Sequence, residues 1–359
     1  MAPAQRPEDG WPETVDGPPG DEAEGTAERR SIRRVLIRRA IPLAITAVGL
    51  YVAWPALLDV FSAWPRLLTL DPAWMWLALL AELASFAVLW ELQRIALRSD
   101  GWFLVVTSQL AGNAFSRIVP GGAPAGAALQ YRMLTVGGLD GASTAVGLTT
   151  VSLLTTATTF ALPVLSVPAI VSGIPVDEKL SNAAWLGLAI FVVLFGVGVA
   201  MLVWDAPLRW VGRAVESILR WLKRGHPEQS DLAFRLVIQR NLIRDNLGSR
   251  WGEALATTIG RSLLDYLALL ASLRATGSQA RPSLVLLAFV VSQVLGLIPI
   301  TPGGLGFVEA GLATTLGLAG VSGPQAVLAT LAYRMVSYWL PLIAGAVAYP
   351  VFRRRYRTL

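Results

Sequence analysis

The chain contains no cysteine and only one histidine among its 359 residues. The absence of cysteine excludes disulfide frameworks, thiolate nucleophiles, iron–sulfur clusters and cysteine-ligated zinc. The one histidine, His226, stands in the polar stretch Arg-Gly-His-Pro-Glu, where a solvated loop residue is the ordinary interpretation. We therefore expect no metal, no cofactor and no enzymatic activity.

Charge is also scarce. Charged residues make up 15% of the chain, against about 25% in an average soluble protein. Hydrophobic residues make up 54%, and the mean hydropathy is +0.55. A soluble domain of this length needs a charged surface, and long stretches here carry no charge at all. The sequence therefore predicts an all-α polytopic membrane protein.

The charges are unevenly distributed along the chain. Residues 1–28 carry eight acidic residues and one arginine, a net charge of −7, so the remainder carries +13 of the total of +6. This first segment is rich in proline, glycine and acidic residues and has little apolar surface to bury. We expect a disordered cytoplasmic tail, and its acidic start does not fit a secretory signal peptide.

Six apolar segments are long enough to cross a bilayer, which takes about 20 residues. They lie near residues 40–60, 72–98, 140–170, 183–204, 253–274 and 325–352. Three shorter pieces, near 101–118, 283–299 and 304–319, are interrupted by proline and glycine, as in re-entrant or discontinuous helices. The pattern predicts about six full spans and two broken helical hairpins within a transmembrane domain over residues 29–352.

Basic residues at the span ends indicate orientation. An arginine cluster precedes the first span, the C-terminal segment 353–359 is basic, and a basic connection over 205–250 follows the fourth span. The loop around 177–179 is left outside. We expect a multi-pass protein of the cell membrane with both termini in the cytoplasm. Residues 209–224 form an amphipathic pattern typical of a helix that lies at the membrane interface. A cytosolic elbow packed on other spans fits this pattern nearly as well. A narrower apolar seam over residues 231–247 predicts a second cytoplasmic helix.

The tripeptide Pro-Gly-Gly occurs twice, at residues 120–122 and 302–304, with an offset of 182 residues. The same offset superimposes the flanking spans, so that two halves, 72–170 and 253–352, each read as span, broken hairpin, span. The charge pattern orients the halves oppositely. We therefore predict an inverted-topology repeat of the kind found in secondary transporters, over the alternative that each tripeptide is a simple turn.

Unwound backbone inside a membrane is tolerated where it lines an interior site. The half-helices after the two motifs present N-terminal amides that suit a phosphate or another anion. The candidate substrate-binding residues are those of the motifs and the polar residues near them. They are Asn113, Arg117, Pro120, Gly121, Gly122, Gly126, Arg132, Pro302, Gly303, Gly304, Gly306, Glu309 and Arg334.

Charges at span depth are costly and need partners. Arg334 lies about nine residues into the last span, on the order of 14 Å from its end, which is too deep for easy snorkelling. Glu309 is our candidate partner, although near a helix start it also suits capping of free amides or contact with an amine. Arg261 and Asp265, at i and i+4, are predicted to pair with each other.

The segments Asn113-Ala-Phe-Ser-Arg-Ile-Val-Pro-Gly-Gly-Ala-Pro-Ala-Gly126 and Pro299-Ile-Thr-Pro-Gly-Gly-Leu-Gly-Phe-Val-Glu309 resemble the flippase-like transmembrane domain of lysylphosphatidylglycerol synthases. The resemblance covers about residues 36–352. It implies a lipid translocator that moves aminoacylated phosphatidylglycerol or another lipid between leaflets. The chain ends shortly after its last span, so we expect a stand-alone member without the aminoacyl-transferase domain.

Three functions remain open at this point. The first is a flippase for a phospholipid or a lipid-linked precursor, with anionic phospholipid headgroups as its partners. The second is a non-transporting partner of a lipid- or glycan-modifying enzyme. The third, a membrane-embedded transferase, lacks a recognisable nucleophile or metal constellation in the sequence. Nothing in the pattern points to nucleic acid.

Overall fold

The structure is a computed structural model that describes residues 65–119, 122–162, 204–222, 232–296 and 302–356, with single positions between 189 and 200. The regular elements in these ranges are all helical, which confirms the all-α class. Several predictions lie outside the described residues. These are the tail 1–28, the span near 40–60, most of the span 183–204, the loop 177–179, Pro120, Gly121 and His226.

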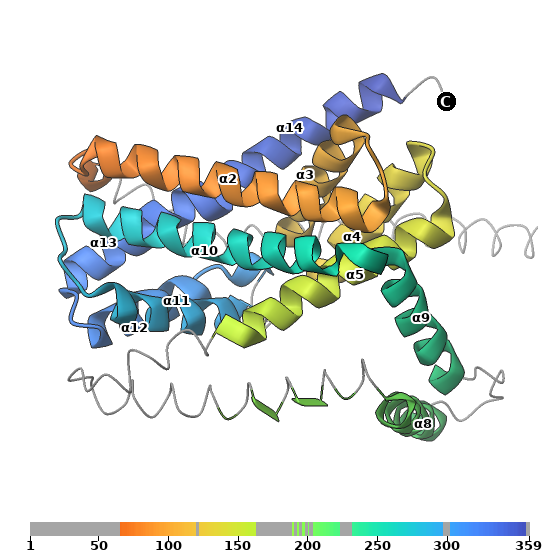
Figure 1. The fold of residues 1–359 in the computed structure, drawn as a ribbon. Coiled ribbons are helices and arrows are strands. Elements are labelled where there is room, and N and C mark those ends of the chain that lie inside the picture. Colours follow the sequence, from red (N-terminus) through yellow and green to blue (C-terminus); the bar gives the residue numbers. More distant parts are fainter. Residues whose placement is uncertain are drawn as a thin grey trace, which may run out of the picture. The chain divides into compact units, whose positions relative to one another are not determined.

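The helices follow one another in the order shown by the colours of Figure 1. They are α2 (Pro72–Leu97), α3 (Trp102–Ile118), α4 (Gly122–Val136), α5 (Gly141–Ala161), α8 (Asp205–Leu222), α9 (Leu232–Leu247), α10 (Trp251–Ala275), α11 (Pro282–Gly296), α12 (Phe307–Leu318), α13 (Gly323–Arg334) and α14 (Leu340–Arg355). A short turn, Gly248–Arg250, precedes α10, and another, Pro302–Gly304, precedes α12. A π-helical turn, Met335–Trp339, joins α13 to α14.

Three continuous helical stretches are long and apolar enough to cross a membrane: Pro72–Leu97, Gly248–Ala275 and Gly323–Arg355. They coincide with three of the six predicted spans. The helices α11 and α12 are apolar but shorter, as expected for the arms of a broken hairpin. The described part of the predicted span 140–170 is α5, of 21 residues. The last stretch has 33 residues, about 50 Å of helix, which exceeds a hydrocarbon core of about 30 Å.

Apolar side chains are exposed in helical stripes on these long helices. On α2 the stripe comprises Trp76, Leu80 and Leu83, on α10 Leu255, Ile259 and Leu263, and on α14 Ile343 and Val347. Their spacing of three or four residues places each set on one face of its helix. A soluble monomer rarely exposes such continuous apolar surfaces. These faces therefore suit contact with lipid.

The start of α2 shows how local sequence sets a helix boundary. The side chain of Asp71 accepts a hydrogen bond of 2.9 Å from the backbone N–H of Ala73, and Pro72 occupies the first helical position. An N-terminal cap of this kind stabilises a helix by about 1 kcal/mol. The helix ends at Arg98, whose backbone has the left-handed conformation, with φ of 50°.

The long helices α2 and α10 pack side by side and run in opposite directions (Figure 1). The backbone N–H of Asp71, at the start of α2, donates to the carbonyl of Ala275, at the end of α10, over 3.2 Å. The order of helix, helical hairpin, helix occurs once in α2 to α5 and again in α10 to α14. The division into repeat halves 72–170 and 253–352 stays a prediction. The orientation of the hairpins relative to the membrane stays a prediction.

Small residues allow the helices around the first hairpin to approach closely. A Cβ added to Gly126 of α4 would lie 2.4 Å from the carbonyl oxygen of Gly112 of α3. A Cβ added to Gly345 of α14 would lie 2.2 Å from the carbonyl oxygen of Leu110, also on α3. Close contact of small residues is a usual way to hold helices together in membranes. It fixes α3, which carries Arg117, against both α4 and α14.

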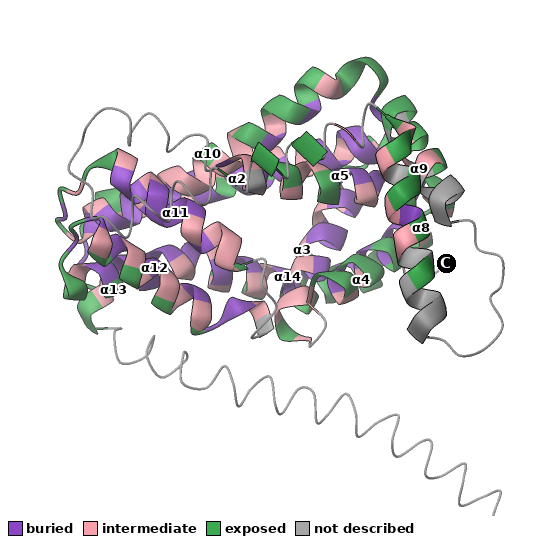
Figure 2. Cartoon of the chain, turned by 90° about the horizontal axis from the view of Figure 1, so that it is seen from below, coloured by how far each residue is buried: buried purple, intermediate pink, exposed green. Residues whose placement is uncertain are grey.

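The predicted helices of the connection 205–250 are present as α8 and α9, which pack against each other. On α8, Trp210 is 68% exposed. In Figure 2, green marks the exposed residues of α8, while purple marks the buried residues concentrated in α11, α12 and α13. The largest core cluster lies among α10 to α13 and contains fully buried Phe289, Leu269 and Leu312. This core surrounds the second broken hairpin.

Candidate functional site

The second Pro-Gly-Gly motif forms the turn that leads into α12. Gly303, Gly304 and Gly306 all have positive φ, of 62°, 72° and 78°, in the region that side-chain-bearing residues rarely adopt. At Gly303 there is also no space, because an added Cβ would lie 2.3 Å from the hydroxyl oxygen of Tyr338. Glycine is therefore needed at Gly303 for both its dihedral angle and its close approach to a tyrosine.

The predicted pairing of Glu309 with Arg334 is confirmed. The Nε atom of Arg334, at the end of α13, lies 2.6 Å from Oε1 of Glu309, in the first turn of α12. The two side chains are 11% and 17% exposed. An Nη2 hydrogen bond from Arg334 also reaches the carbonyl of Gly303 at 3.4 Å. The ion pair thus connects α12, α13 and the glycine turn.

Tyr338 lies between two arginines. The guanidinium carbon of Arg334 is 4.3 Å from the centre of its ring, and that of Arg117 is 4.5 Å from the same centre. Cation–π contacts of this length attract the positive charge to the ring. The two arginines come from different halves of the chain, since Arg117 ends α3 beside the first motif. The structure therefore brings Arg117 and Arg334 to one site.

Arg117 also stabilises an interruption in the last long helix. It donates from Nη1 to the carbonyl of Tyr338 at 2.6 Å and from Nη2 to the carbonyl of Ser337 at 3.1 Å. Pro341 has no N–H, so the Ser337 carbonyl loses its ordinary α-helical donor four residues ahead. Arg117 supplies the missing donor. Single-turn π-helices of this type occur frequently at functional sites.

A second polar group lies between α10, α11 and α13. Oδ1 of Asp265 accepts a 2.6 Å hydrogen bond from the hydroxyl of Tyr333, and Oδ2 accepts a 2.8 Å hydrogen bond from the amide of Gln293. The predicted pairing of Arg261 with Asp265 is wrong, because among the described residues no ion pair joins them. The aspartate instead accepts hydrogen bonds from residues of α11 and α13.

Glu82, on α2, faces this second group. It is 4% exposed, and the hydrogen bonds of Asp71 with Ala275 and of Ser85 with Arg261 place its turn of α2 level with Asp265 on α10. Its Oε2 atom is buried without a hydrogen-bond partner in the described structure. One helical turn further along α2, the hydroxyl of Ser85 donates to the carbonyl of Arg261 at 3.3 Å, which holds this part of α2 against α10.

The remaining predicted site residues take other positions. Asn113 is half-buried on α3, and its carbonyl accepts a hydrogen bond from Ser116. Gly122 begins α4 with φ of 51°, and Gly126 is in the tight contact of α3 with α4. Arg132 is exposed on α4. Pro302 opens the turn before α12. Within the described part of the chain, no hydrogen bond, ion pair or ring contact joins Arg132 to the arginines around Tyr338.

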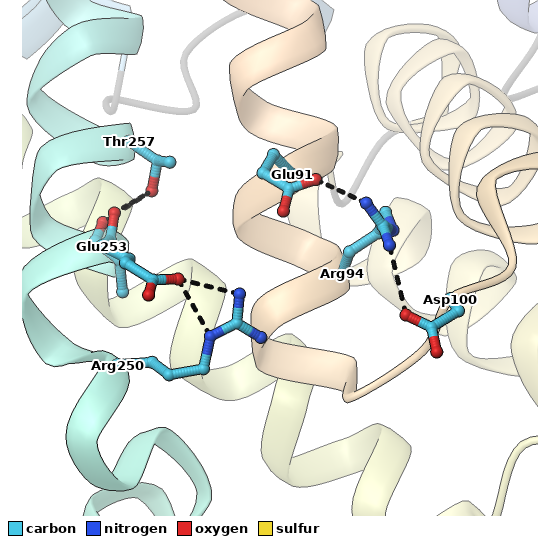
Figure 3. A network of polar contacts seen from close by, with 7 residues as sticks. Glu91, Arg94, Asp100, Arg250, Glu253 and Thr257 are labelled. Atoms are coloured by element: carbon cyan, nitrogen blue, oxygen red, sulfur yellow. Dashed lines mark hydrogen bonds and ion pairs between the residues drawn. The ribbon is translucent and has the colours of Figure 1, made fainter.

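A third set of charges lies at the ends of α2 and α10 (Figure 3). Arg94 bonds Glu91 at 2.8 Å and Asp100 at 3.2 Å, and Arg250 bonds Glu253 at 2.8 Å. Arg250 and Glu253 are 48% and 61% exposed. The pair of Arg250 and Glu253 is therefore more exposed than the pair of Glu309 and Arg334.

Sequence reasoning missed Tyr338, Tyr333 and Gln293 as members of the two polar groups. A signal for Tyr338 was available, because residues four apart share a helical face and Tyr338 follows Arg334 by four. Tyr333 and Gln293 gave no comparable signal. Tyrosine and glutamine are ordinary residues in a membrane helix, and only the packing of α11 and α13 shows that both point at Asp265.

Comparison with known proteins agrees with the resemblance of the two motif segments. The sequence model of the lysylphosphatidylglycerol synthase TM region matches residues 39–345. A UPF0104 membrane protein of Methanothermobacter thermautotrophicus is 36% identical over 64 residues. That match covers 18% of this chain and 19% of the relative, so it spans about a fifth of the relative's length. No solved structure matches the chain. The chain belongs to the lysylphosphatidylglycerol synthase TM region family and is a membrane protein.

Proposed function

We propose that the chain is a lipid translocator, without catalytic activity, that moves a phospholipid or a lipid-linked precursor with an anionic headgroup between leaflets. The observation that carries the proposal is the placement of Arg117 and Arg334 on Tyr338, beside the glycine turn that precedes α12. Both guanidinium groups belong to a membrane protein, where such charges are rare and mark substrate pathways.

The guanidinium group of Arg117 is positively charged and can bind an anion. Arg334 is paired with Glu309, whereas the two hydrogen bonds from Arg117 go to backbone carbonyls. Among the described residues, no carboxylate lies within ion-pair distance of Arg117. A guanidinium group binds phosphate oxygens through two parallel hydrogen bonds and is less strongly hydrated than an ammonium group. A headgroup phosphate is therefore a suitable ligand for Arg117.

Glu309 supports a headgroup that also carries an amine. Its Oε1 atom accepts from Arg334, but its Oε2 atom is buried and has no hydrogen-bond partner in the described structure. A buried carboxylate oxygen gains from a cationic donor. A phosphate at Arg117 and an ammonium group at Glu309 together match an aminoacylated phospholipid such as lysyl-phosphatidylglycerol.

The test is leaflet exchange of labelled phosphatidylglycerol and lysyl-phosphatidylglycerol in liposomes that contain the purified protein. We expect exchange faster than in empty liposomes, and its loss in Arg117→Gln. Arg117→Lys keeps the charge but not the bidentate geometry, so it should retain only part of the activity. Arg250→Gln is the matched control, since it removes an arginine that is 48% exposed and pairs with Glu253 instead of contacting Tyr338, and it should exchange lipid at the wild-type rate.

Two results would contradict the proposal. Normal exchange by a folded Arg117→Gln variant would remove Arg117 from the path. No exchange of any lipid by the folded wild-type protein, with ion gradients supplied, would favour the other function, a non-transporting partner of a lipid- or glycan-modifying enzyme. Helix α8 then becomes the surface to test, because it exposes Trp210 next to basic side chains.

A further inference from the structure

The interior of the helix bundle holds two carboxyl groups on facing turns of α2 and α10. The two helices pack antiparallel, and the hydrogen bonds of Asp71 with Ala275 and of Ser85 with Arg261 place Glu82 level with Asp265, near the middle of both helices. Glu82 is 4% exposed, and its buried Oε2 atom has no hydrogen-bond partner among the described residues. Two carboxylates on facing turns of a low-dielectric interior repel each other, and this repulsion favours the binding of a proton by one of them. The pair is therefore suited to hold one proton.

The hydrogen bonds indicate which carboxyl group is the charged one. Both oxygens of Asp265 accept hydrogen bonds, from Tyr333 at 2.6 Å and from Gln293 at 2.8 Å. Acceptance at both oxygens is the pattern of an ionised carboxylate. No described residue donates a hydrogen bond to Oε2 of Glu82. As a neutral carboxylic acid it has an O–H to give to Asp265, and it avoids leaving a buried charge unsatisfied.

We propose that Glu82 and Asp265 form a proton-binding site, in which Glu82 carries the proton and Asp265, held by Tyr333 and Gln293, accepts its hydrogen bond. On protonation, an O–H bond forms on a Glu82 carboxylate oxygen with a proton from water. On release, the proton returns to water and Glu82 becomes a buried carboxylate. This site is distinct from the arginines at Tyr338 and does not depend on the proposed lipid.

The charged groups around Glu82 determine how its protonation changes the net charge near the arginine site. Asp265 and Arg261 on α10 and Arg117 on α3 interact electrostatically with Glu82. Tyr333, on α13, interacts electrostatically with both Glu82 and Arg334. With Glu82 ionised, these arginines are balanced by Glu82, Asp265 and Glu309. With Glu82 protonated, one positive charge is left over.

This charge balance links the proton to the anion, a step that rests on the proposed function. An anionic headgroup at Arg117 compensates the charge left over when Glu82 is protonated. By linkage, the headgroup and the proton each favour binding of the other. Translocation would then take up a proton with each anionic lipid.

The proton is tested first without any lipid transport, by infrared spectroscopy of the whole protein in detergent. A protonated carboxyl group gives a C=O stretching band that shifts in heavy water, and an ionised one does not. We expect such a band at neutral pH in the wild-type protein and its loss in Glu82→Gln. Glu91→Gln is the control on the same helix, since Glu91 is 36% exposed and pairs with Arg94, and it should leave the band unchanged.

Glu82→Asp covers the case in which Glu82→Gln does not fold. It keeps a carboxyl group in the same place, so the band should shift in frequency instead of disappearing. A wild-type spectrum without the band at neutral pH would overturn the proposal, as would a band that survives in Glu82→Gln. Loss of the wild-type band on addition of Na⁺ at constant pH would also overturn it, because the carboxyl pair would then be a metal-cation site. Failure of lipid exchange alone leaves the band in place and counts against the proposed function only.

Discussion

The ion pair between Glu309 and Arg334 should contribute to stability far more than the exposed pairs of the same protein. Its two side chains are 11% and 17% exposed, and its N–O distance is 2.6 Å. Glu309→Gln leaves the guanidinium group of Arg334 in the interior without its counter-charge. Breaking a buried pair by removal of one partner costs about 3–5 kcal/mol, because the remaining charge stays desolvated.

The structure predicts an order among the variants. Arg334→Gln should cost at least as much as Glu309→Gln, because it also loses the hydrogen bond to Gly303 and the contact with Tyr338. The double variant, Glu309→Gln with Arg334→Gln, leaves no unpaired charge. Its cost should fall short of the sum of the two single costs by about 1–3 kcal/mol, which is the range of coupling between residues in contact.

The assay is reversible unfolding of the purified protein in mixed detergent micelles, followed by tryptophan fluorescence. The control is the exposed pair of Arg250 and Glu253, at 48% and 61% exposure, for which each substitution should cost about 0–1 kcal/mol. If Glu309→Gln destabilises the protein no more than Glu253→Gln, the pair is solvated. The reasoning from burial to stability is then refuted.

Two further outcomes follow from the geometry. Gly303→Ala should destabilise the protein by about 1–3 kcal/mol, because the added Cβ would lie 2.3 Å from the Tyr338 hydroxyl oxygen and because φ is positive at this position. Tyr338→Phe removes that hydroxyl and should restore part of the loss. Gly252→Ala has open space around the added Cβ and should be neutral in the same unfolding assay. The chain has no cysteine of its own, so cysteines can be introduced singly at Ser99 and at exposed Gly323 without further changes. They should react with an impermeant maleimide from opposite sides of the membrane, and reaction of both from one side would disprove the inverted hairpins.

The ion pair was predictable because cost and position identified it. Arg334 is deep in an apolar span, where an arginine needs a partner, and Glu309 was the nearest acid beside the second motif. No knowledge of the packing was required. The three apolar stretches and the two helices of the connection 205–250 were likewise predictable, because length, hydropathy and amphipathic spacing are local properties of the sequence.

The pairing of Arg261 with Asp265 was wrong for a reason that sequence spacing cannot reveal. An i, i+4 spacing places two side chains on one face but does not say what that face meets. Here the face meets Tyr333 and Gln293, which hydrogen-bond both oxygens of Asp265. Tyr333 lies 68 residues and Gln293 lies 28 residues from Asp265 along the chain. Only the lateral packing of the helices selects them.

The end of α13 and the π-helical turn after it supply residues to both polar groups. Tyr333 donates to Asp265, the next residue, Arg334, pairs with Glu309, and one turn later Tyr338 receives both arginines. Adjacent residues on a helix point about 100° apart, so one short segment can serve two sites on different sides. The π-helical turn follows at once, and its carbonyls are held by Arg117 of the other half. Any movement of this segment must therefore change the acidic pair's hydrogen bonds and the arginine site together.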